Sequence, residues 1–162
     1  MKESLKTHVK AIFLKHGEKV KYKIGQSLSS DKYISGSVLL IDKGSARIIV
    51  EENEKLKAVH KISIGDVVGA ISILREKACE NVRSSSDLIA IAITDKTFRK
   101  YYQGDPSFRD YFDSINYFSE IIEFSKYVIN EIPNVKLKIH ELIKLLEKKA
   151  TCFNKSDEQF KE

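Results

Sequence analysis

The chain has 162 residues, which is the length of one ordinary domain with a small addition. Its hydrophobic fraction of 42% and charged fraction of 31% are typical of a folded globular protein and exclude disorder as the main description. Lys and Arg total 28 against 23 acidic residues, a net charge of +5, but residues 1–25 alone hold seven lysines and two glutamates. The remainder is balanced, so the basic surface that nucleic acid requires is not expected.

The chain contains no stretch of about 18 apolar residues and no signal-peptide core, so neither a membrane-spanning helix nor secretion is expected. Two cysteines, Cys79 and Cys152, are too few for a disulfide framework or a cysteine-only zinc site. These features predict a cytoplasmic protein.

The first two thirds of the chain predict one helix followed by many short strands. Apolar residues at helical spacing predict a helix over residues 2–15, which Gly17 ends. Glycine and serine then separate short apolar segments, which we expect to be strands at residues 20–24, 38–41, 46–50, 56–64 and 88–93. Gly44 supplies a residue able to adopt a positive φ in the turn between two of them. This succession predicts a double-stranded β-helix, a jelly-roll barrel, in a mainly β protein with flanking helices.

Everything after residue 94 is predicted to be helical. Thr94 is a good N-cap, Gly104 stops that helix, and Pro106 suits the first position of the next. An apolar stripe continues to Pro133, and residues 135–146 predict one more amphipathic helix. We therefore expect a jelly-roll domain with flanking helices over 1–112, a helical extension over 113–150 and a flexible tail over 151–162.

This order of elements resembles the cyclic-nucleotide-binding domain. Residues 34–47 are similar to that family's pair of strands around a turn with glycine, and the run I-G-D-V-V-G at 64–69 is similar to its l-x-x-G-d-x-F-G. Residues 105–108, D-P-S-F, resemble the start of the helix after the last strand. The resemblance covers roughly residues 13–125 and implies a regulatory fold with a phosphate-binding cassette after residue 68.

The residues that bind the nucleotide in that family are replaced here. Its cassette, G-E-L-A-L-L-x-x-x-P-R-x-A-T-V, implies a glutamate for the ribose hydroxyl and an arginine for the cyclic phosphate. Aligned with it, this chain has Ala70 for the glutamate and Cys79 for the arginine, followed by a carboxylate. The candidate pocket residues are Gly69, Ala70, Ile71, Ser72, Cys79, Glu80, Asn81 and Arg83.

Removing one partner of a desolvated charge pair costs about 2–5 kcal/mol, which would weaken a micromolar site to about the millimolar range. The sequence therefore predicts a degenerate pocket and no cofactor. An alternative is a working sensor of cyclic AMP, cyclic GMP or another small anion. In that case Arg83, on the same face of an extended strand as Cys79 and Asn81, or Arg75 from the loop, would replace the family arginine.

Nothing in the sequence supports catalysis or a metal site. The histidines, His8, His16, His60 and His140, lack metal-ligand spacing, and no nucleophile has a base beside it. Glu80 next to Cys79 should raise the pKa of the thiol, so we expect an unreactive cysteine. The chain is not expected to be an enzyme.

The cassette also resembles that of a divergent group, the N-terminal domains of cyanobacterial ABC exporters that carry a peptidase. The run from Gly65 to Glu80 is similar to their G-x-x-V-G-x-x-S-L-L-R-G-x-P-C-E, with Ala78 in place of the proline. This resemblance implies a non-catalytic regulatory or interaction module of a transporter that secretes peptides or toxins. The module would lie at the cytosolic face of the transporter, and its membrane link would be indirect.

About 30 residues follow Glu131, too few for the helix-turn-helix that Crp-type regulators add to this fold. Two apolar helix faces remain, which either cover the core or dock a protein partner or a second copy. These faces are Ile115, Phe118, Ile122 and Ile129, and Val135, Ile139, Leu142 and Leu146.

Overall fold

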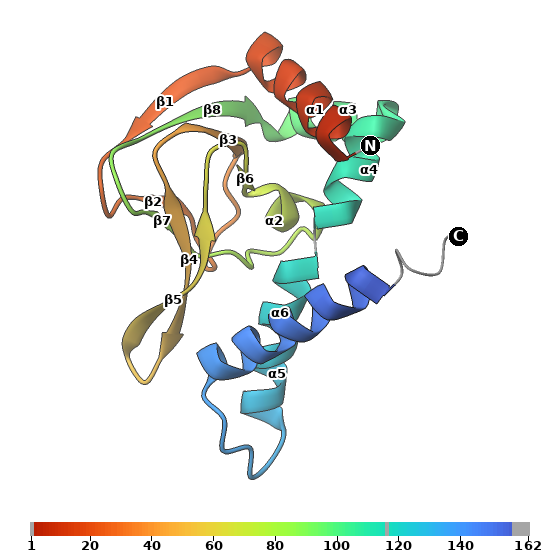
Figure 1. Ribbon diagram of the computed structural model, residues 1–162. Coiled ribbons are helices and arrows are strands. Elements are labelled where there is room, and N and C mark those ends of the chain that lie inside the picture. The colour runs from red at the N-terminus through yellow and green to blue at the C-terminus, as the bar shows by residue number, and fades with distance from the viewer. Residues whose placement is uncertain (1, 116, 157–162) are drawn as a thin grey trace.

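The computed structural model describes residues 2–115 and 117–156, and within them eight strands form two antiparallel sheets of four strands each (Figure 1). In the first sheet the order is β1 (Glu18–Tyr22), β8 (Leu88–Thr94), β3 (Ser37–Lys43) and β6 (Val67–Val68). In the second the order is β2 (Ser27–Ser29), β7 (Val82–Ser84), β4 (Ala46–Glu52) and β5 (Lys55–Ile62). The predicted fold class, mainly β with the jelly-roll arrangement and flanking helices, is confirmed.

The two central strands of the first sheet, β3 and β8, are buried on both faces, which explains their nearly continuous apolar sequences. Because side chains alternate along a strand, Leu39 and Ile41 point into the core between the sheets while Val38 and Leu40 point to the other side. The side chains of β8 alternate between the two faces in the same way. Strand β8 pairs with β3 in the register Leu39↔Ala92. A continuous apolar run is the pattern expected of such a strand.

Three helices cover the outer face of the first sheet: α1 (Lys2–His16), α3 (Asp95–Gly104) and α4 (Pro106–Ile115). Their buried aromatic rings contact one another, and the centroids of Phe98 and Phe112 lie 4.9 Å apart. The N-cap is as predicted, since the backbone N–H of Thr97 donates to Oγ1 of Thr94 at 3.2 Å. The predicted end at Gly104 and start at Pro106 are also confirmed.

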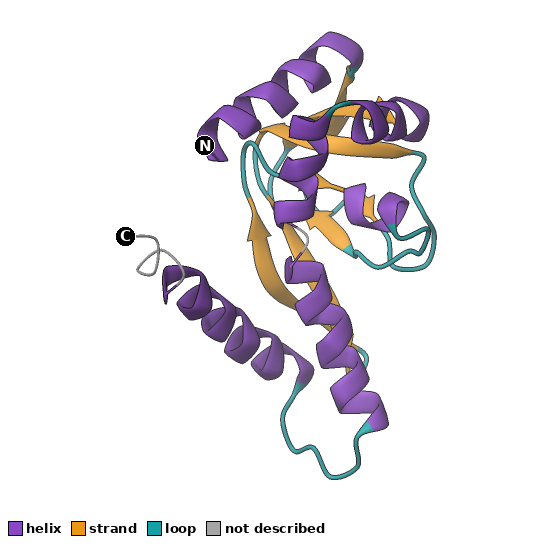
Figure 2. Cartoon of the chain, turned by 90° about the vertical axis from the view of Figure 1, so that its right-hand side faces the viewer, coloured by secondary structure: helices purple, strands orange, loops and turns teal. Residues whose placement is uncertain are grey.

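The last two helices, α5 (Tyr117–Glu131) and α6 (Ile139–Ser156), lie side by side and pack on β4 and β5 (Figures 1 and 2). Phe118, Ile122, Ile139 and Ile143 are buried in the same cluster as the side chains between the two sheets. Phe118, Ile122 and Ile139 of the predicted apolar faces therefore cover the core, whereas Ile115 is 37% exposed. Helix α6 begins at Ile139 rather than at residue 135, because the backbone N–H of Ile139 donates to Oε1 of Glu52, at the end of β4, at 2.7 Å.

Two boundaries predicted from the sequence can be compared with these elements. Residue 150 lies inside α6, and residues 157–162 of the expected tail lie outside the described residues.

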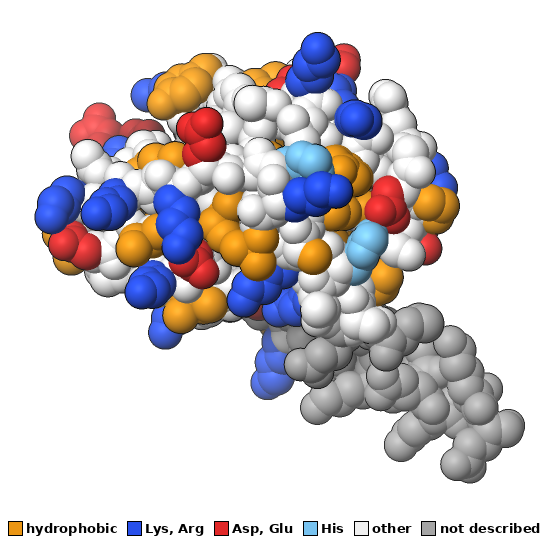
Figure 3. Space-filling model, turned by 90° about the horizontal axis from the view of Figure 1, so that it is seen from above, with side chains coloured by type: hydrophobic (Ala, Val, Ile, Leu, Met, Phe, Trp, Pro, Cys, Tyr) orange, Lys and Arg blue, Asp and Glu red, His pale blue; other side chains and the backbone are white. Residues whose placement is uncertain are grey.

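Among the helices described, none is both long enough and apolar enough to cross a membrane. Seen from above, lysine and arginine side chains lie interspersed with acidic and apolar ones on the visible face (Figure 3).

Candidate functional site

A hollow of about 250 Å³ lies between the second sheet, the short helix α2 (Ala70–Leu74) and the C-terminal helices. Its walls include Ala70 from α2, Glu80 from the loop after it, His60 from β5 and Phe118 from α5. Phe118 is almost fully buried, and its ring lies 4.3 Å from that of His60, centroid to centroid. This volume is slightly below the range of about 300–1,000 Å³ that is usual for pockets of drug-sized ligands.

Tyr111 of α4 lines another wall of this hollow. Burial, with a smaller contribution from the charge of Asp66, raises the pKa of Tyr111 to about 12. The hydroxyl therefore stays protonated at neutral pH and contributes no charge to the hollow.

The first turn of α2 is bound by the protein's own carboxylate. Gly69 has φ +89° and precedes the helix, and its backbone N–H donates to Oε2 of Glu80 at 2.8 Å. A helix N-terminus favours negative charge because its N–H groups are unpaired. In this protein Glu80 supplies that charge. It does so at the position where the resemblance to the family cassette implies a bound phosphate.

Cys79 faces the inside of the cassette instead of the hollow. Its backbone N–H donates to Oγ of Ser72 at 3.3 Å, and its Sγ lies 3.5 Å from the same hydroxyl. Burial raises the pKa of the Cys79 thiol and the Glu80 charge adds to the effect, whereas the Ser72 hydrogen bond opposes them. The predicted direction of this pKa shift is confirmed, and the thiol is neutral at physiological pH.

The two cations of the cassette loop are held by α5. Arg75 forms an ion pair with Glu120, and Nζ of Lys77 lies 3.1 Å from Oε2 of Glu123. Burial acts to raise the pKa of Glu123, but Lys77 and Lys126 outweigh it and lower that pKa. Arg75 is thus engaged with an acid on the helix that covers the hollow.

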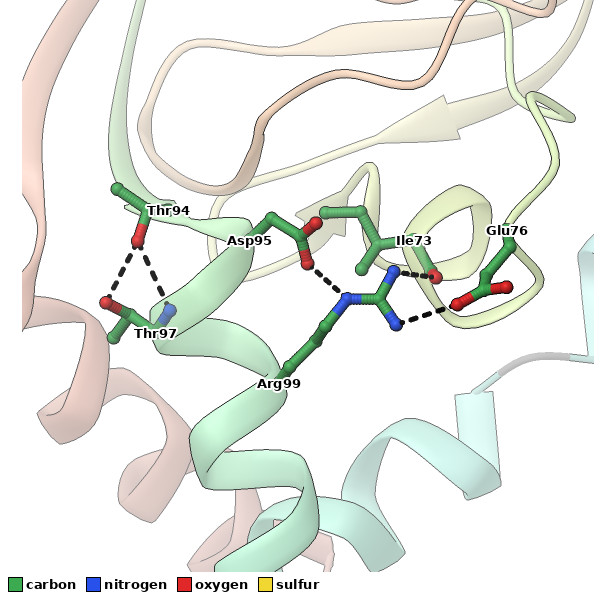
Figure 4. Close-up of polar contacts among 6 residues, drawn as sticks. All are labelled: Ile73, Glu76, Thr94, Asp95, Thr97 and Arg99. Carbon is green, nitrogen blue, oxygen red and sulfur yellow. Dashed lines mark hydrogen bonds and ion pairs between the residues drawn. The ribbon is translucent and has the colours of Figure 1, made fainter.

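Arg99 of α3 holds the other end of α2 (Figure 4). Its Nη2 donates to the backbone carbonyl of Ile73 at 2.9 Å, its Nη1 lies 3.4 Å from Glu76, and its Nε donates to Asp95 at 2.6 Å. Sequence reasoning did not select Arg99, although the Asp95–Arg99 spacing of four residues was a visible signal for the local pair. The contact with Ile73 had no sequence signal.

Arg83 does not line the hollow with Ala70 and Glu80. The prediction that Cys79, Asn81 and Arg83 share one face of a strand is wrong, because residues 75–81 are turn and loop and β7 begins only at Val82. The Ser72 contacts hold Cys79 against α2, and the carbonyl of Asn81 accepts a hydrogen bond from the backbone N–H of Ile49. Arg83 lies in a separate hollow with Arg47.

In residues 2–115 and 117–156 no group of three or more His, Cys, Asp or Glu side chains is placed to hold a metal ion. The polar side chains of the cassette have partners within the protein: Glu80 bonds to Gly69, Ser72 contacts Cys79 and Arg75 pairs with Glu120. The arrangement fixes the cassette against its neighbours.

No family model matches the chain, and no curated protein matches it in sequence. Solved structures match it in three dimensions. The chain superposes on the catabolite activator protein of Thermus thermophilus with a TM-score of 0.60 and 11% identity, over 76% of this chain and 58% of that one. The fold is that of a cyclic-nucleotide-binding domain.

Two further structures with this fold are a regulatory domain of protein kinase A from Toxoplasma gondii, crystallised with cyclic AMP, and the c-di-GMP-responsive regulator CLP of Xanthomonas campestris. The first has a TM-score of 0.56 and 14% identity, over 66% of this chain and 41% of that one. The second has a TM-score of 0.53 and 14% identity, over 80% and 74%. This chain spans less than two thirds of the Thermus and Toxoplasma proteins, and at these identities the likeness establishes the fold alone.

Proposed function

We propose that this chain is a non-catalytic regulatory or interaction module in which its own carboxylate, Glu80, takes the place of the nucleotide phosphate. One observation carries the proposal: the carboxylate of Glu80 accepts the hydrogen bond from Gly69, at the end of α2 where the fold binds a phosphate. Ala70 and Cys79, in the positions of the family's ribose and phosphate ligands, offer neither an acceptor nor a charge. A nucleotide phosphate would have to displace Glu80 and bind beside its negative charge.

The helices over the hollow support the same function. Phe118 fills space against His60, and Glu120 and Glu123 pair with the two cations of the cassette loop. A ligand would have to break these contacts to enter. No arginine stands in the phosphate position of the cassette to offset the lost interactions. The module therefore acts through its surface and not through an exchangeable nucleotide.

Calorimetric titration of the full chain with cyclic AMP and cyclic GMP tests this proposal. We expect no saturable heat up to millimolar nucleotide. The matched variant, Ala70→Glu with Glu80→Ala, adds an acceptor for the ribose in the hollow and removes the competing carboxylate, and we expect measurable binding if it retains the wild-type far-UV spectrum. Saturation of the unmodified chain at micromolar nucleotide would overturn the proposal, whatever the variant does.

The alternative, a sensor that uses Arg75 or Arg83, makes the opposite prediction. Under that function the unmodified chain binds, and Arg75→Ala or Arg83→Ala abolishes the signal. Arg75 is paired with Glu120 and Arg83 lines another hollow, so neither arginine stands in the cassette hollow in place of the family arginine.

We further propose that a protein partner or a second copy contacts the outer side of α5. Phe124 and Tyr127 are one turn apart and leave 54% and 59% of their surface exposed, so the two side chains form a neighbouring apolar pair on the helix surface. Light scattering coupled to size-exclusion chromatography should separate the two occupants. A dimer that Phe124→Ser dissociates would identify a second copy, whereas a monomer would leave a different protein as the partner.

The setting of the module within an exporter stays a prediction. It is supported by the likeness of residues 65–80 to the cassettes of exporter domains, including the Cys79-Glu80 pair. A pull-down that recovers a transporter ATPase or peptidase with the full chain would support it, and association with an unrelated regulator would oppose it.

A further inference from the structure

A row of three cationic side chains crosses the outer face of the second sheet. Arg83 of β7 lies directly opposite Arg47 of β4, and Arg47 lies directly opposite Lys61 of β5. Residues directly opposite each other on neighbouring strands project to the same face. Since Ile48 lines the hollow beneath the helices, the adjacent Arg47 projects away from it, and the row lies on the other side of the sheet.

The row has no acidic partner in the part of the chain that the structure describes. None of Arg47, Lys61 and Arg83 forms an ion pair with an Asp or Glu side chain there. The Nε atom of Arg83 is inaccessible to solvent and has no hydrogen-bond partner. Like charges directly opposite in a sheet are destabilising, and a buried donor without an acceptor adds to that cost. An anion bound between the arginines would remove both penalties.

The space for such an anion is present. Arg47 and Arg83 line a hollow of about 260 Å³ together with Gly25, Ile49, Leu56 and Ala58. Gly25 has no side chain to fill the hollow, and Leu56, which is 52% exposed, gives it an apolar rim. Two guanidinium groups suit a phosphate group, whose oxygens accept paired N–H donors, and the rim suits the carbon part of a phosphate ester.

We propose that Arg47 and Arg83, flanked by Lys61, bind a phosphate group on the outer face of the second sheet, independently of the cassette. The phosphate comes either from a small phosphate ester or from a lipid headgroup. This site does not depend on the state of the cassette hollow, so it stands or falls separately from the function proposed above.

Thermal unfolding of the full chain in sodium phosphate and in sodium chloride of equal ionic strength tests the site with inorganic phosphate as the probe. We expect a higher Tm in phosphate, and phosphate binding roughly tenfold weaker or worse in Arg83→Gln and in Arg47→Gln. In chloride the two variants should be at least as stable as the wild type, because each removes a repulsion. A structural role for Arg83 would lower the Tm in both salts.

Lys96→Gln, an exposed cation on α3, is the matched control and should retain the full phosphate effect. General salting-out by phosphate would raise the Tm of every variant alike. An equal rise in wild type and Arg83→Gln, or no difference between the two salts for the wild type, would overturn the proposal.

Co-sedimentation with vesicles distinguishes the two sources of phosphate. Binding to phosphatidylcholine vesicles that contain phosphatidic acid, but not to phosphatidylcholine alone, and its loss in Arg83→Gln, would identify the lipid headgroup. A phosphate-specific Tm rise without sedimentation would identify a small phosphate ester.

Discussion

At the scale of single residues, Gly69 shows how backbone conformation and available space determine the residue type. Its φ of +89° is unfavourable for residues with a side chain, and a Cβ atom added there would lie 3.1 Å from the carbonyl oxygen of Ser37. The same residue donates the hydrogen bond to Glu80. A change at this position therefore alters the cassette and its internal carboxylate together.

We expect Gly69→Ala to lower the free energy of unfolding by about 1–2 kcal/mol, because an L-residue pays that cost in the left-handed region. Urea unfolding followed by circular dichroism measures it. Gly36→Ala is the control: a Cβ there meets nothing within 4 Å and φ is not positive, so the change should stay within about 0.5 kcal/mol. Equal losses in the two variants would contradict this account.

Alignment with a known cassette located Gly69, Ala70 and Cys79, because the chain around them keeps the spacing of the fold. The alignment could not identify the hydrogen-bond partners of these residues. The hydrogen bond from Gly69 to Glu80 and the bond from Arg99 to the carbonyl of Ile73 join residues 11 and 26 positions apart. Such contacts depend on how the loop after α2 returns, which no local pattern in the sequence encodes.

At the scale of elements, the start of α6 is attached to the end of β4 by one carboxylate. Glu52 accepts hydrogen bonds from the backbone N–H of Ile139 and from Nδ1 of His140, at 2.7 and 2.9 Å. Burial acts to raise the pKa of Glu52, but these two hydrogen bonds and the nearby positive charges outweigh it, and the pKa is lowered. The charged form of Glu52 is therefore the one that holds the start of α6.

A lowered pKa in the folded state means that Glu52 stabilises the protein above its ordinary carboxyl pKa of 4.5. That contribution is lost as the pH falls through the lowered value. We expect Glu52→Gln to reduce the Tm at pH 7, and the gap to the wild type should close as the pH drops below 4.5. Differential scanning calorimetry across pH 3–7 measures both trends.

Glu51→Gln removes the same charge from the exposed neighbouring position and serves as the control. It should leave the Tm almost unchanged at pH 7. A gap between wild type and Glu52→Gln that stays constant across the pH range would show that ionised Glu52 does not hold the helix.

The boundaries of elements were predictable wherever local chemistry decides them. Thr94, Gly104 and Pro106 act through their own side chains or backbone and mark helix ends without help from the rest of the chain. The segment from Cys79 to Arg83 was not predictable in this way. Its first residues bond to Ser72 of α2, so the strand starts later than its sequence indicates, and Arg83 faces a different hollow.

At the scale of the whole molecule, the two sheets and the last two helices share one core. Leu39 of β3, Ile48 of β4, Phe118 of α5 and Ile143 of α6 belong to a single buried cluster. The division at residue 112 that the sequence predicts is thus crossed by apolar packing. Neither part can expose its side of this cluster without cost.

We expect one cooperative unfolding transition for the full chain, with the helical signal at 222 nm and tyrosine fluorescence coinciding in urea. Phe118→Ala should lower the midpoint of both signals together, because Phe118 belongs to the common cluster. A separate, earlier loss of the helical signal would indicate that α5 and α6 unfold as their own unit.

The Glu80 carboxylate also has a consequence for any soluble anion that reaches the cassette. Glu80 is tethered to Gly69 by the intervening loop, so its effective concentration at that N–H group is set by the length of the loop, on the order of millimolar or higher for a short tether. Diluting the protein leaves this value unchanged. A diffusing anion that binds this N–H group must therefore compete with the Glu80 carboxylate at every protein concentration.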